Sequence, residues 1–180
     1  MMAAIAHRAG KRSLDEDRMR EICQFTARTF QTARPVPYGA LIVNTHSGKR
    51  LVRATNAVVG ENDPSSHAEL RAVRLACKKL KCVSLAGYTM YSTFEPCAMC
   101  MANALWAGLD RVVFGGTIAD AARYCVQVHV GAREVARRAD MSCVVDGPVA
   151  RELCCALLTH PNMQRAFRRW KIGERKRSGR

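Results

Sequence analysis

Two short stretches of the chain carry residues that could hold a metal ion. The stretch DPSSHAEL contains His67 and Glu69, and the stretch STFEPCAMC contains Cys97 and Cys100. Both are expected just after a loop, where a helix begins, and the positive end of a helix dipole favours a thiolate. Cysteines three residues apart on a first helical turn point the same way, so one ion can bind both sulfur atoms.

Three uses of the Cys97 and Cys100 pair compete. A redox dithiol of the thioredoxin type is expected after the first strand of a βαβ unit, whereas this pair lies late in the chain. A closed structural zinc site needs a fourth soft ligand, and the nearest spare thiols, Cys77 and Cys82, do not pair with His67 in a recognised spacing. The pattern favours the third use, in which two thiolates and an imidazole hold zinc and leave a fourth position for a reactive water.

Glu69 is the residue that could move protons at such a site. It lies two residues after His67, is not itself a ligand, and can sit beside the water. A structural interpretation competes, because Ser66 and Glu69 also form a capping-box pattern in which the carboxylate reaches back to the Ser66 amide. The cysteine pair downstream favours the catalytic interpretation. The two interpretations point the carboxylate in different directions.

The bulk composition indicates one globular domain. The chain has 180 residues, of which 48% are hydrophobic, so it can build a core without disulfides. Its nine cysteines are odd in number and irregular in spacing, which predicts a reducing compartment rather than a secreted disulfide framework. No segment is long and apolar enough to span a membrane, and the N-terminus is a poor signal peptide, so a cytoplasmic location is expected.

The net charge of +14 favours polyanionic partners or anionic substrates. The positive charge concentrates after Met163, where a basic tail either stays solvated or contacts nucleic acid. We divide the chain into an N-terminal arm (residues 1–12), a single domain (residues 13–172) and a basic, flexible tail (residues 173–180).

The hydrophobic pattern predicts an α/β domain with a mixed sheet between helices. A capping box formed by Ser13 and Glu16 predicts the start of the first helix, which runs to about residue 32. Leu70, Val73, Cys77 and Leu80 are expected to form the buried face of a helix that begins near Ser66. Strands are expected at residues 40–43, 51–55, 88–91, 111–114 and 142–145, the first two as a hairpin. Further helices are expected at residues 97–107, where the lack of charge predicts burial on most sides, at 130–138, at 148–158, and after Pro161.

The ordered combination H-x-E and P-C-x-x-C is the signature of zinc deaminases that act on nucleobases. Together with VPYGALIV, TNAVVGENDPSSHAELRAVRLACKKL, MYSTFEPCAMCMANALWAG and DAA, it resembles the cytidine deaminase-like superfamily, nearest the branch of guanine deaminases and bacterial tRNA adenosine deaminases. The resemblance covers about residues 37–120. It implies a three-layer α/β/α fold with a central mixed five-stranded sheet, one zinc ion per subunit, and a homodimer. It also implies hydrolytic replacement of an exocyclic amine by a carbonyl, with release of ammonia.

The same resemblance implies roles for single residues. His67, Cys97 and Cys100 would hold zinc, and Glu69 would shuttle protons. The base would be contacted by Asn56 and by the backbone around Ala68.

Aromatic residues favour a free purine-like base, with guanine first. Tyr38 and Trp106 stand where guanine deaminases carry aromatic side chains, although core packing is the competing explanation for both. The acidic C-terminal motif of guanine deaminases is missing, and Asp120 could substitute for it or could cap a helix. Two alternatives stay open: a deaminase of adenosine in tRNA or another single strand, and a catalytically silent, zinc-containing RNA-binding module.

Overall fold

A mixed five-stranded sheet forms the centre of the protein in the computed structural model, which describes residues 2–177 and the side chains of residues 14–170. The strand order is β2-β1-β3-β4-β5. Strand β1 pairs antiparallel with β2 and with β3, whereas β3, β4 and β5 run parallel. The sheet confirms the mixed topology and the hairpin expected from the sequence. The strands are β1 (Gly39–Asn44), β2 (Arg50–Thr55), β3 (Tyr88–Phe94), β4 (Arg111–Gly116) and β5 (Val144–Asp146).

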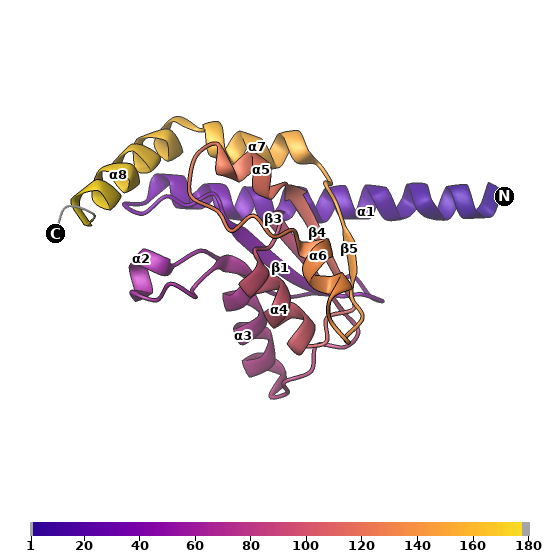
Figure 1. Ribbon diagram of the computed structural model, residues 1–180. Helices are drawn as coiled ribbons and strands as arrows, with labels where there is room; N and C mark the ends of the chain where they lie inside the picture. The colour runs from indigo at the N-terminus through magenta and orange to yellow at the C-terminus, as the bar shows by residue number, and fades with distance from the viewer. Residues whose placement is uncertain (1, 178–180) are drawn as a thin grey trace.

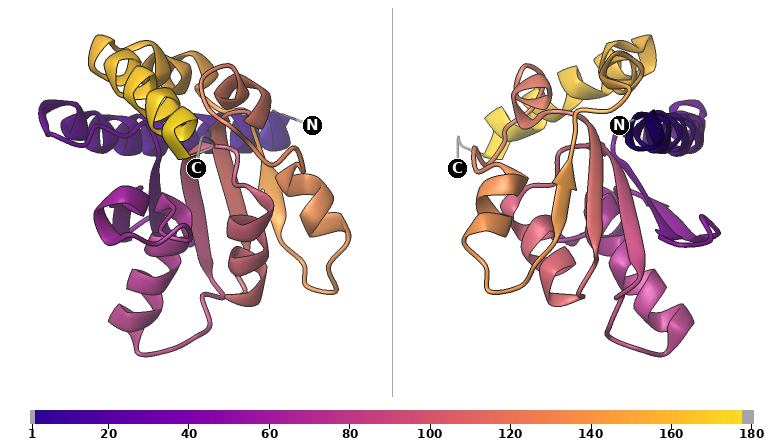
Figure 2. Two further views of the ribbon diagram at one scale, coloured as in Figure 1. Left: turned by 60° about the vertical axis from the view of Figure 1, so that its left-hand side comes forward. Right: turned by 90° about the vertical axis from the view of Figure 1, so that its right-hand side faces the viewer.

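Helices cover both faces of the sheet and make a three-layer arrangement (Figures 1 and 2). One hydrophobic cluster joins the sheet to the long first helix and to the two C-terminal helices, and the other joins it to the helices that carry the motifs. The first face is covered by α1 (Met2–Ala27), α7 (Arg151–Thr159) and α8 (Pro161–Arg177), and the second by α3 (Ala68–Leu80), α4 (Ala98–Trp106) and α6 (Ala132–Arg137).

Strand β1 shows why the sheet must be covered twice. Successive side chains of a strand point to opposite faces. Leu41 and Val43 pack into the cluster beside α1, whereas Ala40 and Ile42 pack into the cluster beside α3. All four are buried, so the run of apolar residues marks a strand buried on both faces.

The first helix is longer than predicted. The capping box at Ser13 predicts a helix start there, but α1 begins at Met2 and carries Ser13 in its interior. The preceding residues are rich in alanine, which has the highest helix propensity, so the helix continues toward the N-terminus instead of starting at a cap. The helix ends at Ala27 and is followed by a short 3₁₀ turn, η1 (Arg28–Gln31).

Helix α3 buries a different face from the one predicted. Of the four residues expected to form its apolar face, only Val73 is buried, while Leu70, Cys77 and Leu80 are half-buried. The buried positions include Ala68, Ala72 and Ala76. Small side chains let the helix axis lie close to the sheet, so the alanine face, rather than the bulkier one, is turned inward.

Helix α4 is also less enclosed than its lack of charge suggests. Its inner face is buried, but Met99 is 38% exposed and Trp106 is 80% exposed. The prediction of burial on most sides is therefore wrong for the single chain. An uncharged helix can be stable with only one face buried in the core. The lack of charge does not show whether its other face is buried.

The C-terminal half agrees with the predicted elements, with small shifts. Pro148 precedes α7 and does not lie in its first turn, whereas Pro161 opens α8 as predicted. Helix α8 continues to Arg177, so residues 173–177 of the predicted tail are helical, and residues 178–180 lie outside the described part of the chain. The sequence patterns did not indicate the short helices α2 (Val58–Glu61) and α5 (Ile118–Ala122). Within the described residues, no helix is both long and apolar enough to cross a membrane.

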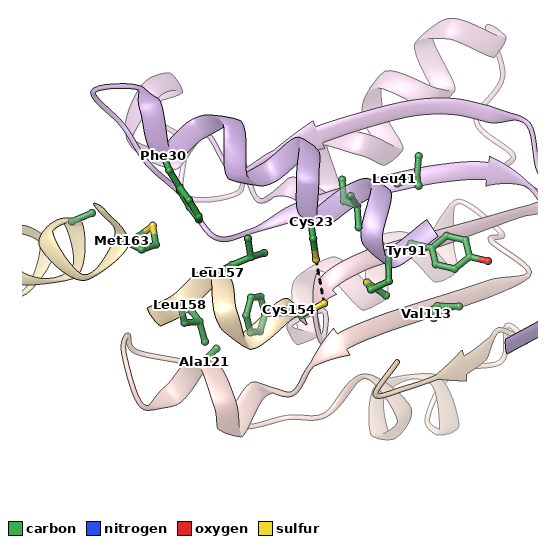
Figure 3. Packing of buried hydrophobic residues seen from close by; sticks show 14 of the residues in the cluster. Cys23, Phe30, Leu41, Tyr91, Val113, Ala121, Cys154, Leu157, Leu158 and Met163 are labelled. Atoms are coloured by element: carbon green, nitrogen blue, oxygen red, sulfur yellow. Dashed lines mark hydrogen bonds between the residues drawn. The ribbon is translucent and has the colours of Figure 1, made fainter. Parts of the chain in front are cut away.

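The cluster between α1 and α7 contains a second pair of neighbouring thiols. Cys23 of α1 and Cys154 of α7 are buried, and their Sγ atoms lie 3.4 Å apart (Figure 3). All nine cysteines are free thiols. These two thiols serve as small apolar side chains between helices.

The strand order brings the functional motifs to one edge of the sheet. Strands β2, β3 and β4 run in the same direction, opposite to β1. The residues that follow β2, β3 and β4 therefore lie at the same edge of the sheet as the residues that precede β1. Ligand sites of open α/β sheets lie at such carboxyl edges.

Candidate active site

His67, Cys97 and Cys100 converge at this edge, as the sequence predicts. Their possible ligand atoms all lie within 4.8 Å of one another. Nδ1 of His67 is 3.6 Å from Sγ of Cys97. Zinc bonds of about 2.3 Å to sulfur and about 2.0 Å to nitrogen place tetrahedral ligand atoms roughly 3.5–3.8 Å apart, so one zinc ion fits between these atoms with small side-chain adjustments.

The local backbone explains how two separate motifs present their ligands. His67 is the N-cap of α3 and Cys97 is the N-cap of α4, both with extended backbone conformation. Neither side chain makes a capping hydrogen bond. The imidazole and the thiol are therefore available for a metal, while the helix N-termini supply partial positive charge for thiolates.

Cys97 and Cys100 share one hydrogen bond, which changes the pKa values of both thiols in opposite directions. A hydrogen bond from the Cys100 thiol, aided by the one with His67, lowers the pKa of Cys97. Donation to the Cys97 sulfur, together with burial, raises the pKa of Cys100. The first proton therefore leaves this pair easily, and the second is held until a cation replaces it. This behaviour suits a site that binds a divalent metal through two thiolates.

Glu69 points toward the metal ligands and not back to the N-terminus of its helix. The residue is buried, with 6% of its surface exposed. Oε1 accepts a hydrogen bond from Ser92 Oγ at 3.0 Å, and Oε2 lies 3.8 Å from Cys100 Sγ. No capping hydrogen bond to the Ser66 amide forms, since that amide donates to the carbonyl of Asp63 instead. Burial raises the pKa of Glu69.

His67, Cys97 and Glu69 line a cavity of about 360 Å³, whereas Cys100 is buried and does not line it. The cavity wall combines proposed ligands with aromatic, polar and small apolar side chains. It is lined by Tyr38, Asn56, His67, Glu69, Phe94, Glu95, Cys97, Ala98, Met99, Ala121, Cys125, Val126, Gln127 and Val128.

Two of the residues predicted to contact substrate lie in this wall. The Tyr38 ring packs edge-on against Phe94, with 5.5 Å between ring centroids, and its hydroxyl lies 2.8 Å from Cys125 Sγ. Oδ1 of Asn56 accepts the Val58 N–H at 3.2 Å. That bond fixes the amide, so the Asn56 Nδ2 group is the one left to donate a hydrogen bond to a ligand.

Three other predicted contacts lie outside the cavity wall. Trp106 is neither a core residue nor a cavity residue of this chain, because it ends α4 on the surface. Asp120 pairs with Arg151 and forms a capping box with Thr117, and the hydrogen bonds from Arg151 and then from Thr117 lower its pKa. The helix-capping interpretation of Asp120 is therefore the one that the structure favours. Ala68 is buried between His67 and Glu69 and does not line the cavity.

Several residues of the site are not indicated by the sequence patterns. Ser92, which orients Glu69, could have been found as a polar residue in an otherwise apolar strand. Glu95 lies next to the P-C-x-x-C motif, and its carboxylate accepts the N–H groups of Ala132 at 2.9 Å and of Ile118 at 3.3 Å. It thereby anchors the first residues of α6 and α5 beside the cavity. Residues 125–128 carry no local signal for a place in the wall.

The chain is similar in sequence to known deaminases. The sequence model of the cytidine and deoxycytidylate deaminase zinc-binding region matches residues 12–116. A tRNA-specific adenosine deaminase of Buchnera aphidicola is 36% identical over 108 residues, which cover 58% of this chain and 64% of that protein. A guanine deaminase of Bacillus subtilis is 38% identical over 86 residues, which cover 48% of this chain and 54% of that protein.

The fold also has solved counterparts. The structure of a guanine deaminase from Nitrosomonas europaea superposes with a TM-score of 0.74 at 23% identity, covering 82% of this chain and 84% of that one. This likeness confirms the three-layer fold of the cytidine deaminase-like type. The matched regions span between half and two thirds of the length of the two relatives named above. Because the family model matches more than half of the sequence, the chain belongs to the cytidine and deoxycytidylate deaminase zinc-binding family.

Proposed function

We propose that this protein is a zinc-dependent deaminase that replaces an exocyclic amine of a nucleobase or nucleoside by a carbonyl. The observation that carries the proposal is the position of Glu69. Its buried carboxylate lies beside a group of two thiols and one imidazole, at the wall of a cavity. A metal site with a structural role has no need of a buried acid next to it, whereas hydrolysis needs a proton carrier there.

The donor set fits a catalytic zinc ion, one per subunit. His67, Cys97 and Cys100 supply three ligands, and no fourth histidine, cysteine or acidic ligand atom joins the group within the described residues. Three protein ligands and an open position are the arrangement of catalytic zinc sites. When bound, zinc would lower the pKa of a water molecule and so supply the nucleophile near neutral pH.

Glu69 would carry the protons of the reaction. Its raised pKa, caused by burial, brings a carboxyl closer to the pH at which it can both accept and release a proton. It would accept one proton from the attacking water and pass it to a ring nitrogen, and it would then move the proton of the added hydroxyl to the leaving amine as the carbonyl forms. One carbon–oxygen bond forms, one carbon–nitrogen bond breaks, and ammonia leaves. The hydrogen bond from Ser92 Oγ would hold the carboxylate in place for these transfers.

Guanine, or a related purine-like base, is the substrate that we favour. The cavity of about 360 Å³ can hold a heterocycle, and the rings of Tyr38 and Phe94 form an aromatic part of its wall. Stacking of a base on an aromatic side chain is worth roughly 1–3 kcal/mol. The B. subtilis relative is a guanine deaminase.

Adenosine in tRNA is the second candidate, because the B. aphidicola relative is a tRNA-specific adenosine deaminase. The net charge of +14 also suits a polyanion, and the basic C-terminal segment could contact phosphates. A catalytically silent RNA-binding module with structural zinc is the third candidate, and the buried Glu69 argues against it.

Ammonia release separates these candidates. Zinc-loaded protein would be incubated with guanine, adenine, cytosine, their nucleosides and tRNA, with Glu69→Ala as the matched control. We expect ammonia from guanine and none from tRNA. Ammonia from tRNA alone would select the second candidate, with an affinity that falls steeply as salt rises. No ammonia from any substrate, together with salt-sensitive RNA binding, would select the third.

A homodimer is the expected assembly. Helix α4 leaves Met99 and Trp106 exposed on the same layer as the metal ligands, and exposed apolar side chains beside a site suit a protein interface. Covering this surface by a second copy would also explain why the helix carries no charge. Sedimentation equilibrium measures the assembly directly, and Trp106→Glu should shift it toward the monomer.

A further inference from the structure

One wall of the cavity has no part in the chemistry proposed above. Residues 125–128 follow α5 without regular secondary structure, and all four line the cavity. In the strand order β2-β1-β3-β4-β5, Asn56 follows β2, whereas this segment follows β4 and α5. Asn56 and residues 125–128 therefore flank the ends of β1 and β3, where Tyr38 and Cys97 lie.

Most other polar side chains of the cavity are already engaged within the protein. Both carboxylate oxygens of Glu95 accept backbone N–H groups, those of Ala132 and Ile118. The Tyr38 hydroxyl contacts the Cys125 thiol at 2.8 Å. His67 and Cys97 are assigned above to zinc, and Glu69 is assigned to proton transfer. The other polar side chains of the cavity are the amides of Asn56 and Gln127. A substrate must therefore be recognised mainly by the two amides.

The two amides offer opposite hydrogen-bonding groups. Asn56 uses Oδ1 to accept the Val58 N–H, which leaves its Nδ2 as a donor. Gln127 donates from Nε2 to Cys125 Sγ at 3.2 Å. No hydrogen bond to Gln127 Oε1 is found among the residues that the structure describes, so this oxygen is left as an acceptor. The Tyr38 hydroxyl, which contacts Cys125 and also interacts with the Gln127 side chain, helps to fix the orientation of Gln127.

The geometry points to Gln127 as a specificity-determining residue, whose Oε1 accepts a hydrogen bond from a ring N–H of the substrate base. This inference rests on the proposed deamination and narrows its substrate class. A lactam base such as guanine carries ring N–H groups. Adenosine in a polynucleotide carries none, because its other ring nitrogens are acceptors and N9 bears the sugar. Gln127 therefore selects a free lactam base over adenosine in tRNA.

The neighbours of Gln127 cannot take its place. Val126 and Val128 line the same wall but carry no polar side-chain atom, and they are 82% and 59% exposed. A site built to hydrogen-bond a substrate N–H discriminates strongly against an analogue that lacks it, because the protein group is left unpaired. Loss of the Gln127 acceptor should therefore change the choice among bases and leave the metal centre intact.

The test uses zinc-loaded wild type, Gln127→Leu and Gln127→Glu, with guanine, 1-methylguanine and 9-methylguanine. The quantity measured is kcat/KM, or the inhibition constant where an analogue is not turned over. Gln127→Leu should lower kcat/KM for guanine roughly ten- to a hundredfold, with zinc content unchanged. It should have little effect on the analogue whose methyl group blocks the recognised N–H. Gln127→Glu keeps an acceptor oxygen and should retain most of the activity on guanine.

Arg123→Ala serves as the control, since Arg123 is exposed, lies in the same part of the chain and does not line the cavity. Unchanged kcat/KM for guanine in Gln127→Leu would overturn the inference and leave the proposed function standing. An equal loss on guanine and on both methylated bases would overturn it too, because it would report general damage to the cavity. Absence of turnover of every lactam base by wild type would overturn the proposed substrate together with the inference.

Discussion

Two pairs of neighbouring cysteines lie on opposite faces of the same sheet and have opposite chemical surroundings. Cys97 and Cys100 stand at the start of α4, with the His67 imidazole 3.6 Å from Cys97 and a cavity alongside. Cys23 and Cys154 lie between α1 and α7, with 3.4 Å between their sulfur atoms, within a hydrophobic cluster. Close approach of two thiols is therefore not what makes a metal site.

The difference lies in what stabilises a negative charge on sulfur. At the α4 pair, hydrogen bonds with the Cys100 thiol, with His67 and with the Cys100 backbone N–H in the first turn of the helix lower the pKa of Cys97. At the core pair, the hydrogen bond with Cys23 and burial both act to raise the pKa of Cys154. At the α4 pair a cation can therefore replace a proton, whereas the surroundings of Cys154 favour its neutral thiol.

The largest effect is expected from removing one sulfur of the metal pair. Cys97→Ala leaves two ligands, which is too few to hold zinc, so zinc content should fall from about one per chain to near zero and turnover should be lost. Zinc measured by atomic emission on purified protein checks this. Cys154→Ala is the matched control and should keep its zinc. Equal zinc content in Cys97→Ala and Cys154→Ala would contradict the claim that only the Cys97 and Cys100 pair binds the metal.

Removing the proton carrier should separate zinc binding from catalysis. Glu69→Gln keeps a hydrogen-bonding side chain of the same size beside Ser92, so the fold and the zinc content should persist. Turnover should drop roughly 10²–10⁴-fold, the usual loss when a general acid or base is removed. Steady-state ammonia release gives the rate. Near-normal turnover would assign the proton transfers to another group.

The reactivity of the two pairs should differ with pH in the metal-free protein. Because its pKa is lowered, Cys97 is already a thiolate at mildly acidic pH, and its alkylation rate should change little between about pH 6 and about pH 8. An unperturbed thiol with a pKa of about 8.5 gains roughly 70-fold in thiolate over that range. Cys154 should stay unlabelled until the protein unfolds. Iodoacetamide labelling followed by peptide mass spectrometry reads both sites, and labelling of Cys154 at the rate of Cys97 would contradict the contrast.

The smallest effect is expected from the core pair itself. Cys154→Ala removes one heavy atom from a fully buried site and should lower the free energy of unfolding by about 0.5–1.5 kcal/mol, as other single-group deletions in cores do. Urea denaturation measures the change. A loss accompanied by release of zinc would show that the two pairs are coupled across the sheet and would contradict their independence.

The sequence predicts the metal centre and most of the sheet because both depend on local patterns. His67, Glu69, Cys97 and Cys100 are recognisable by their spacing and by their places at helix starts. The strands are recognisable by runs of apolar residues long enough to be buried on both faces. These spacings and apolar runs can be recognised without knowing how distant parts of the chain pack.

Features that depend on distant contacts could not be predicted in the same way. Residues 125–128 reach the cavity only because the chain returns after β4, and no local pattern records that return. The choice of the alanine face of α3 depends on how closely the helix approaches the sheet. The exposure of Trp106 depends on what covers α4. The early start of α1 is different in kind, because the alanine-rich residues before Ser13 are a local signal, and the prediction gave the capping-box pattern more weight.

The X-ray absorption spectrum at the zinc edge tests the metal centre most directly. On the purified wild-type protein it should report two sulfur neighbours at about 2.3 Å and two nitrogen or oxygen neighbours at about 2.0–2.1 Å, one of them from solvent. A fit that requires three or four sulfur atoms, or a correctly folded protein that binds no zinc, would contradict the open His67–Cys97–Cys100 site on which the proposed function depends.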